Sequence, residues 1–186
     1  ECDERKGTKN LNAKLSKLNK NVDINIYVSD WIKEIFNEHE MSSKISYVIK
    51  GGPNQEIYNS LNRSLWTENK KLKLVTHHWS SNIMKGFYEY KFIDSLLDQK
   101  NKFNFEFTII GNIPTNFDFN NTNILKPMTG SKLANELKQH HIYVTASQNE
   151  PSGNHHMEGA MCGLPILFID SGALPEYCDE FGVEFN

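Results

Sequence analysis

Arginine, paired cysteines and long apolar runs are all scarce in this sequence. Of its 20 basic residues only Arg5 and Arg63 are arginines, so phosphate clamps built from several guanidinium groups are disfavoured. The formal net charge of -3 argues against a dedicated nucleic-acid-binding protein. No apolar stretch approaches the ~20 residues that a transmembrane helix needs. We therefore expect no nucleic-acid partner and no membrane-spanning segment.

The cysteine pattern of the sequence does not indicate a disulfide framework. Cys2, Cys162 and Cys178 are odd in number and far apart, and no CxxC pair occurs. This pattern favours free thiols in a reducing compartment, so we expect a cytoplasmic protein. The chain opens with "ECDERKGTKN", without Met or the pattern of a signal peptide, and we expect it to be a fragment.

Strand-like apolar segments alternate with helix-like amphipathic segments along most of the chain. This alternation predicts βαβ units, and hence an α/β fold with a Rossmann-like parallel sheet and helices on both faces. Expected helices include 31–40, 87–99, 131–139 and 155–163. The strands are expected at 22–30, 45–49, 72–78, 105–111, 122–125, 142–147 and 165–170.

Aromatic residues are concentrated in the second of these expected helices. Their helical spacing predicts core positions for Phe87, Tyr88, Tyr90 and Phe92. Trp79 precedes that helix, and packing and stacking on a ligand are equally open for it.

Two of the loops that follow expected strands carry charged residues with small neighbours. The stretch "SQNEPSGNHHMEGAMCGLP" places Glu150 in a loop and Glu158 about one turn into a helix for which Asn154 is a plausible cap. Ligands of open parallel sheets bind at the carboxyl ends of the strands. A helix N-terminus there suits a phosphate, and a carboxylate suits the cis-diol of a ribose. Lys85, next to Gly86 in the other loop, can neutralise a diphosphate.

Each of these residues also has an ordinary structural interpretation. A glutamate in the first turns of a helix more often complements the helix dipole, and a lone lysine is more often a solvated charge. The histidine pairs 77–78, 140–141 and 155–156 disfavour a metal site, because adjacent side chains point to different faces. His140 and His141 end an expected helix and suit its dipole, and Cys162 suits packing.

Taken together, these motifs resemble retaining glycosyltransferases of the GT-B fold, especially family 4. "E-PSGNHHM-E", with seven residues between Glu150 and Glu158, is similar to the E-x(7)-E motif of that family. "MKGF" resembles its K-G-F element, "FTIIGN" its strand-to-glycine turn, and "MCGLPILFIDSGALPE" its continuation through Gly172 and Glu176. Upstream, "NIYVSDWIKEIF" and "VIKGGPN" resemble the end of the N-terminal domain and the crossover into the C-terminal one.

The resemblance implies a role for each matching residue. Lys85 would stabilise the diphosphate leaving group, Glu150 would contact the hydroxyls of the donor sugar, and Glu158 would hold the ribose hydroxyls. The remaining donor-binding positions would be Gly86, Gly111, Asn112, Pro127, Met128, Ser152, Gly153 and Asn154. The family works without a metal and no D-x-D pair is present, so no cofactor is expected.

The sequence departs from the family pattern at a few positions. Ser80 stands where the family usually has an arginine, five residues before Lys85, and His77 or His78 could substitute for that phosphate contact. Ser152-Gly153 replaces the family's F-G, and His155 and His156 occupy apolar positions of the motif. These polar replacements could alter the sugar preference.

The resemblance implies a domain organisation and a function. Residues 1–50 would be the remnant of an N-terminal Rossmann-like domain, 51–71 a linker, and 72–186 a C-terminal nucleotide-sugar-binding domain. The protein would move a sugar from a UDP-, GDP- or ADP-sugar to a glycan, lipid or small acceptor. The acceptor half, with any contact to the inner face of a membrane, would precede residue 1. The alternatives are a catalytically silent nucleotide- or sugar-binding module and, more distantly, a non-glycosyl α/β domain such as a receiver or a sugar isomerase.

Overall fold

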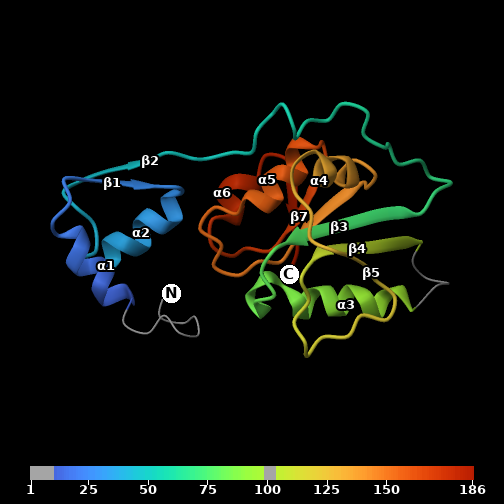
Figure 1. Ribbon diagram of the computed structural model, residues 1–186, viewed down its shortest axis with the longest axis horizontal. Coiled ribbons are helices and arrows are strands. Elements are labelled where there is room, and N and C mark those ends of the chain that lie inside the picture. The colour runs from blue at the N-terminus through green and yellow to red at the C-terminus, as the bar shows by residue number, and fades with distance from the viewer. Residues whose placement is uncertain (1–10, 99–103) are drawn as a thin grey trace.

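The computed structural model describes residues 11–98 and 104–186, and Figure 1 shows a small N-terminal unit beside a larger α/β unit. The expected remnant at 1–50 and the residue Cys2 therefore lie partly or wholly outside the described residues. The N-terminal unit is built from α1 (Leu11–Asn19), β1 (Ile24–Tyr27), α2 (Asp30–Glu38) and β2 (Ile45–Val48).

The N-terminal unit is a short parallel strand pair accompanied by two helices, α1 and α2. β1 and β2 pair from Ile24 opposite Ile45 to Tyr27 opposite Val48. Ser29 caps α2, because its Oγ accepts a hydrogen bond from the Ile32 N–H at 3.3 Å. The expected strand–helix boundary is therefore confirmed.

The larger unit contains one parallel sheet whose strand order is β5-β4-β3-β6-β7-β8 within the described ranges. The chain steps outward from β3 to β5 and then returns to β6 on the other side of β3. Such a reversal creates a topological switch point between β3 and β6. The elements are β3 (Leu72–His78), η2 (Ile83–Lys85), α3 (Phe87–Leu97), β4 (Phe105–Gly111), β5 (Asn123–Leu125), α4 (Gly130–Leu137), β6 (Ile142–Thr145), α5 (Asn154–Met161), β7 (Ile166–Phe168), α6 (Leu174–Cys178) and β8 (Gly182–Glu184).

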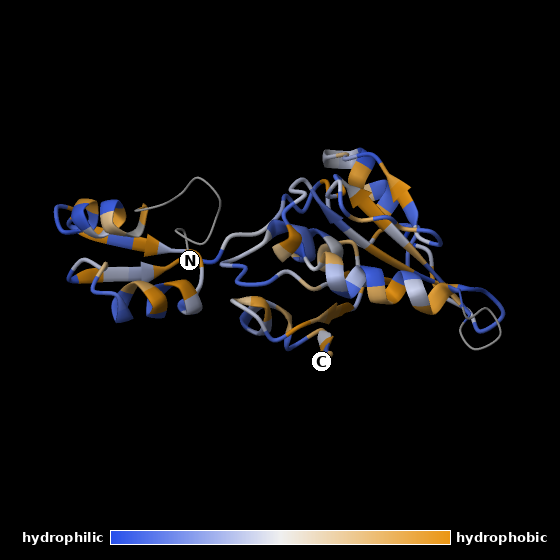
Figure 2. Ribbon diagram, turned by 90° about the horizontal axis from the view of Figure 1, so that it is seen from below, coloured by the Kyte–Doolittle hydropathy of each residue, from blue (hydrophilic) through white to orange (hydrophobic). Residues whose placement is uncertain are grey.

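Helices cover both faces of this sheet, as the strand–helix alternation predicts. Figure 1 shows α3 on one face and α4 and α5 on the other. The helices in Figure 2 alternate between hydrophobic and hydrophilic residues, as expected where one side of a helix packs on a core. Fully buried Phe107 and Ile109 belong to the core on the α3 side, and Leu137 and Ile166 to the core on the other side. The prediction of a Rossmann-like α/β fold is thus confirmed.

One part of the predicted core is wrong. Phe87 and Tyr90 of α3 are buried as expected, but Tyr88 and Phe92 are 63% and 64% exposed. Tyr88 and Phe92 are four residues apart and so share one stripe of the helix, turned away from the stripe that carries Phe87 and Tyr90. Helical spacing identified an aromatic helix without identifying which of its sides is buried.

The segment 51–71 has neither helix nor strand, and part of it packs on the larger unit. Tyr58 is only 6% exposed and joins the core on the α4 and α5 side. Arg63 donates a hydrogen bond to the carbonyl of Gly163, and the Ser64 N–H donates to the Lys138 carbonyl at 2.7 Å. Residues 58–64 therefore form a strap along the sheet unit.

Glu176 on α6 joins the two units. Its carboxylate accepts hydrogen bonds from the backbone N–H groups of Asp30 at 3.0 Å and Trp31 at 3.2 Å, at the start of α2. The same carboxylate pairs with Lys50 Nζ at 2.9 Å. Although burial alone would raise it, these hydrogen bonds lower the pKa of Glu176. A negative charge at a helix N-terminus is favourable, so Glu176 acts as a cap supplied by the other unit.

Candidate donor-binding site

The candidate residues lie at the carboxyl ends of adjacent strands. His77 and His78 end β3, Gly111 ends β4, and Ser147 to Gly153 follow β6. In the sheet order β4-β3-β6, the loops after these strands converge on the switch point between β3 and β6. Most of the residues singled out from the sequence are thereby brought to one edge of the sheet.

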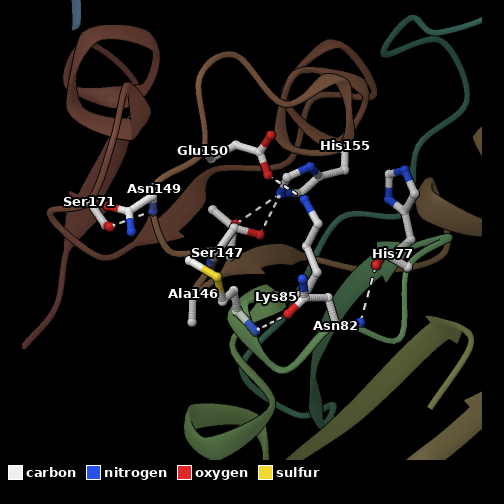
Figure 3. Close-up of polar contacts among 12 residues, drawn as sticks. His77, Asn82, Lys85, Ala146, Ser147, Asn149, Glu150, His155 and Ser171 are labelled. Carbon is white, nitrogen blue, oxygen red and sulfur yellow. Dashed lines mark hydrogen bonds and ion pairs between the residues drawn. The ribbon is translucent and has the colours of Figure 1, made fainter. Parts of the chain in front are cut away.

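Lys85 and Glu150 form an ion pair across this edge, shown in Figure 3. The lysine ends η2 and is 23% exposed in its side chain, whereas Glu150 is 13% exposed. The two loops are also joined through their backbones, since the Gln148 N–H donates to the Met84 carbonyl at 2.7 Å. The predicted diphosphate residue and the predicted sugar residue are thus direct partners.

A glycine is required where the Lys85 loop approaches β6. Gly86 has a φ of 92°, and a Cβ there would lie 2.5 Å from the Cβ of Ala146. Both the backbone conformation and the space therefore exclude a side chain. The structure thus gives a steric reason for a glycine at this predicted site position.

The loop that carries Glu150 is held by the turn after β7. The Ala173 N–H donates to the Glu150 carbonyl at 2.8 Å, and the Asn149 N–H donates to Ser171 Oγ at 2.9 Å. Gly172 has a φ of 65°, and a Cβ there would lie 2.4 Å from the Glu150 nitrogen. The resemblance includes Gly172, and the structure gives it a physical reason.

The helix after Glu150 begins at Asn154, one residue earlier than it would if Asn154 were the N-cap. Gly153, with a φ of 65°, is the N-cap of α5, and Asn154 is the first helical residue and is exposed. The expectation that Asn154 caps the helix is wrong, because the left-handed turn at Gly153 sets the entry into the helix. Ser152 Oγ donates to the Tyr177 hydroxyl at 3.4 Å. The first-turn N–H groups of α5 follow directly on the Glu150 loop.

Glu158 lies on the inner side of α5 and contacts β3. Its Oε2 lies 2.7 Å from His77 Nε2, and its side chain is 18% exposed. His77 is itself held by Tyr143, whose hydroxyl is 3.1 Å from His77 Nδ1. Burial, followed by the Glu158 charge, raises the pKa of Tyr58 to about 12, which places the strap residue beside the same carboxylate.

The other histidines of the cleft are neutral at physiological pH. Burial, together with the charge of Lys85, lowers the pKa values of His78 and His156 to about 4. Burial and the neighbouring His156 lower the pKa of His155 well below its ordinary value. His155 Nε2 lies 3.1 Å from Thr145 Oγ1 and 3.3 Å from Ser147 Oγ. Lys85 rather than these histidines therefore supplies positive charge to the cleft.

His140 and His141 lie away from this cleft, near the amino ends of β3 and β6. His140 Nδ1 donates to the Glu136 carbonyl at 3.0 Å, in the last turn of α4. His141 Nδ1 accepts a hydrogen bond from the Lys73 N–H at 2.9 Å. Burial lowers the pKa of both rings. His140 thus satisfies a carbonyl in the last turn of α4, whereas His141 bonds the backbone of β3.

The remaining predicted residues lie at neighbouring positions of the same edge. Asn112 donates from Nδ2 to the Trp79 carbonyl at 2.6 Å, and a Cβ at Gly111 would lie 2.1 Å from the His78 carbonyl oxygen. Pro127 and Met128 follow β5, two strands from β3, and Met128 packs against the core. The Trp79 ring is 62% exposed, so packing does not explain it.

Sequence reasoning missed the tyrosines that support the site. Tyr143 and Tyr58 contact or adjoin Glu158 and its histidine, but each stands in an apolar or irregular segment with no motif of its own. The only available signal for Tyr143 was a hydroxyl in the middle of the buried strand "IYVT". A buried tyrosine hydroxyl usually requires a partner, and His77 is that partner here.

Cysteine and metal chemistry have little structural support in the described residues. Burial raises the pKa of the Cys162 thiol to about 11 and that of Cys178 to about 12. Across residues 11–98 and 104–186, no three His, Cys, Asp or Glu side chains are grouped so that they could hold a metal ion. Across the same ranges, no helix has the length and apolar character to cross a bilayer.

Comparison with known proteins supports the fold through structure and not through sequence. No family profile and no curated protein matches the chain. Sucrose-phosphate synthase from Thermosynechococcus elongatus superposes with a TM-score of 0.69 at 17% identity, over 99% of this chain and 50% of that one. Anabaena HepE, solved with UDP and glucose, gives 0.72 at 14% identity over 95% and 53%.

A further structure extends the same similarity. WaaG, a glycosyltransferase involved in lipopolysaccharide biosynthesis, gives a TM-score of 0.69 at 13% identity over 86% of this chain and 48% of that one. The chain spans about half the length of these proteins, and a third of the pneumococcal O-GlcNAc transferase GtfA. These proteins are GT-B glycosyltransferases. The chain therefore has the fold of the Rossmann-like half of a GT-B glycosyltransferase.

Proposed function

We propose that this chain binds the nucleotide-sugar donor of a retaining glycosyltransferase that needs no metal ion. The observation that carries the proposal is the presence of two pairs, Lys85–Glu150 and His77–Glu158, at the switch point of the sheet. This edge therefore carries one lysine and two carboxylates beside the start of a helix. A diphosphate, a sugar and a ribose require this combination of charge and hydrogen-bond acceptors.

The diphosphate would lie between Lys85 and the first turn of α5. Free backbone N–H groups and the positive end of the helix dipole favour phosphate there. Because the neighbouring histidines are neutral, Lys85 would supply the charge that stabilises the leaving nucleoside diphosphate. A lysine and a helix end in this position would do the work of a divalent cation, which is the basis of the proposed metal independence.

The two glutamates would divide the hydroxyl contacts of the donor. Glu150, at the start of the loop, would accept hydrogen bonds from the sugar, and Glu158 would accept them from the ribose. Each carboxylate keeps a partly exposed side chain, 13% and 18%, and so can accept further hydrogen bonds. GtfA and HepE were solved with UDP and a sugar, which supports this ligand class. The acceptor would be a glycan, a lipid or a small molecule.

A second candidate is a module that binds the nucleotide or sugar without catalysis. One observation favours it: Ser80 occupies the place of the usual arginine, is exposed, and accepts a hydrogen bond from the Asn82 N–H at 3.1 Å. In this structure His77 is engaged with Glu158, so its use as a substitute phosphate ligand would require it to leave that carboxylate.

Calorimetric titration with UDP, GDP, ADP and their sugar derivatives tests the proposal. We expect one nucleotide to bind, with Kd raised at least tenfold by Lys85→Ala and by Glu158→Ala, because each removes a charged contact worth about 1.5–3 kcal/mol. Lys132→Ala and Glu180→Ala, at exposed positions, are the matched controls. The absence of nucleotide binding by the folded chain would refute the donor site.

Catalysis and metal independence are tested with the bound donor. Slow release of free sugar from the donor, unchanged in EDTA and abolished by Lys85→Ala, would support an active and metal-free transferase. Binding without any turnover, in the presence of acceptor candidates, would favour the silent module instead.

A further inference from the structure

We propose that His77 is a positioning residue that aims Glu158 at the nucleoside ribose, and that Tyr143 fixes the His77 ring for this task. The inference rests on the proposed function, because it assigns Glu158 to the ribose. It adds residues from β3 and β6 that no part of the E-x(7)-E motif contains. Three features of the structure carry it: the tautomer, the anchor and the open edge of the carboxylate.

The hydrogen bonds define the His77 tautomer. A carboxylate only accepts hydrogen bonds, so the contact at 2.7 Å places the proton on His77 Nε2, which donates to Glu158 Oε2. If the ring is neutral, Nδ1 is then an acceptor, and the Tyr143 hydroxyl lies 3.1 Å from it and 3.2 Å from the His77 carbonyl oxygen, so it can donate to either. Contacts therefore run from Tyr143 through His77 to Glu158, in the manner of carboxylate–histidine pairs that orient ligands.

Tyr143 is a rigid anchor for this chain. It is fully buried, and its hydroxyl also accepts a hydrogen bond from the His77 backbone N–H at 3.1 Å. The same tyrosine sets the depth of α5, because a Cβ at Gly159 would lie 2.5 Å from the Tyr143 ring. Tyr143 thus positions both residues. Its ring packs against Gly159, next to Glu158 in α5, and its hydroxyl contacts His77.

The far side of Glu158 remains available to a ligand. Its side chain is 18% exposed, whereas His77 is 8% exposed and Tyr143 is buried. A carboxylate that is held by His77, has Tyr58 beside it and is still partly exposed presents a fixed acceptor to a vicinal diol. Without His77, the Glu158 side chain could rotate. Ordering it when the ligand binds would then cost conformational entropy and weaken the affinity.

Ribose-dependent binding is the first test. The probes are whichever of UDP, GDP and ADP binds the unmodified chain most tightly and its 2′,3′-dideoxy analogue. We expect His77→Ala to raise Kd about tenfold for the ribonucleotide and less than twofold for the dideoxy analogue, since one hydrogen bond to a charged group is lost. His77→Gln, whose amide nitrogen can reach the Nε2 position, should restore most of the affinity. His39→Ala, at an exposed histidine, is the control.

Histidine NMR is the second test and needs no nucleotide. Long-range ¹H–¹⁵N correlation should show His77 with its proton on Nε2 and an unprotonated Nδ1, and Tyr143→Phe or Glu158→Ala should shift that pattern. An Nδ1–H tautomer, or a pattern indifferent to both substitutions, would overturn the positioning role.

The two ways of failing are distinct. If Glu158→Ala weakens the ribonucleotide and the dideoxy analogue equally, or if no nucleotide binds, the ribose assignment of the proposed function is wrong and the inference falls with it. If Glu158→Ala removes the preference for ribose while His77→Ala leaves it intact, only the inference is overturned.

Discussion

Two regions of the larger unit are organised around carboxylates, and they treat them differently. Asp94 on α3 is 1% exposed and anchors the loop before β5. It receives hydrogen bonds at 2.7–3.1 Å from the backbone of Asn120, Asn121 and Thr122 and from the Thr122 hydroxyl, and it pairs with Lys91 at 3.0 Å. At the cleft, Glu150 pairs with Lys85, and Glu158 contacts His77 with Tyr58 beside it, yet both carboxylates remain partly exposed.

The comparison separates a structural carboxylate from a candidate binding carboxylate. Burial alone would raise the pKa of Asp94, yet hydrogen bonds from Thr122, Asn121 and Asn120 lower it to about 2. Its oxygens are saturated by groups of the protein itself. The side chains of Glu150 and Glu158 have fewer protein partners and stay 13% and 18% exposed, so their oxygens can still accept hydrogen bonds from a ligand. A carboxylate whose oxygens are all hydrogen-bonded within the protein therefore indicates a structural role. A carboxylate with remaining acceptor capacity indicates a binding role.

The largest effect is expected from removing the structural carboxylate. Asp94→Ala leaves the loop N–H groups without their acceptor and removes the ion pair with Lys91, and should lower the free energy of unfolding by about 3 kcal/mol. Urea denaturation measures it, with Asp98→Asn, at the exposed end of the same helix, as control. Equal stability of the two variants would contradict the structural role.

Acid should reveal the same group. The native pKa of Asp94, about 2, lies below the value of ~4 in the unfolded chain. Its contribution is therefore complete above about pH 4 and is lost as the pH falls towards 2, amounting to about 2 kcal/mol. Stability curves of the unmodified chain and of Asp94→Asn should converge in this window. Parallel curves down to pH 2 would assign the acid sensitivity to other groups.

Substitution of the cleft residue Glu150 should affect ligand affinity more than stability. Glu150→Gln keeps the shape of the side chain and loses one ion pair with Lys85, so we expect a change in unfolding free energy within about 1 kcal/mol. Nucleotide-sugar affinity should fall by far more than stability does. A loss of stability as large as that of Asp94→Ala would make Glu150 a structural residue and erase the distinction.

The smallest effect is expected at the contact between the two units. Glu176→Gln weakens the cap on α2 and the pair with Lys50, at a cost of about 1 kcal/mol or less. Amide hydrogen exchange should register it as roughly fivefold faster exchange at Asp30 and Trp31. The control is Glu180→Gln. If Glu176→Gln leaves the exchange rates of the Asp30 and Trp31 amides as slow as they are in this control, Glu176 does not stabilise the start of the helix.

Sequence patterns were informative about the fold because parallel strands are buried on both faces and appear as apolar runs. They also placed Lys85, Glu150 and Glu158 near one another, since loops after parallel strands meet at one edge. Strand order was not readable, because hydrogen-bond pairing between distant segments leaves no local pattern.

The misses have a common physical origin. Tyr88 and Phe92 are apolar but lie on the exposed side of α3, which depends on how the helix is rotated against the sheet. The partners of Asp94 are backbone groups 26 to 28 residues away, at the end of "NFDFNN" and at the Thr122 that follows it, in a segment that by composition is an ordinary polar loop. Tyr143 and His77 are 66 residues apart. Contacts of this kind are decided by tertiary packing alone.

The absence of a side chain at Gly172 has a consequence for how the protein can vary. With its φ of 65° and a would-be Cβ 2.4 Å from the Glu150 nitrogen, this turn tolerates neither another residue nor an altered length without moving the neighbouring loop. Lineages that retain the donor site should therefore change the two loops together or not at all. Drift at position 172, beside an unchanged Glu150, would mark copies of the protein that have stopped using it.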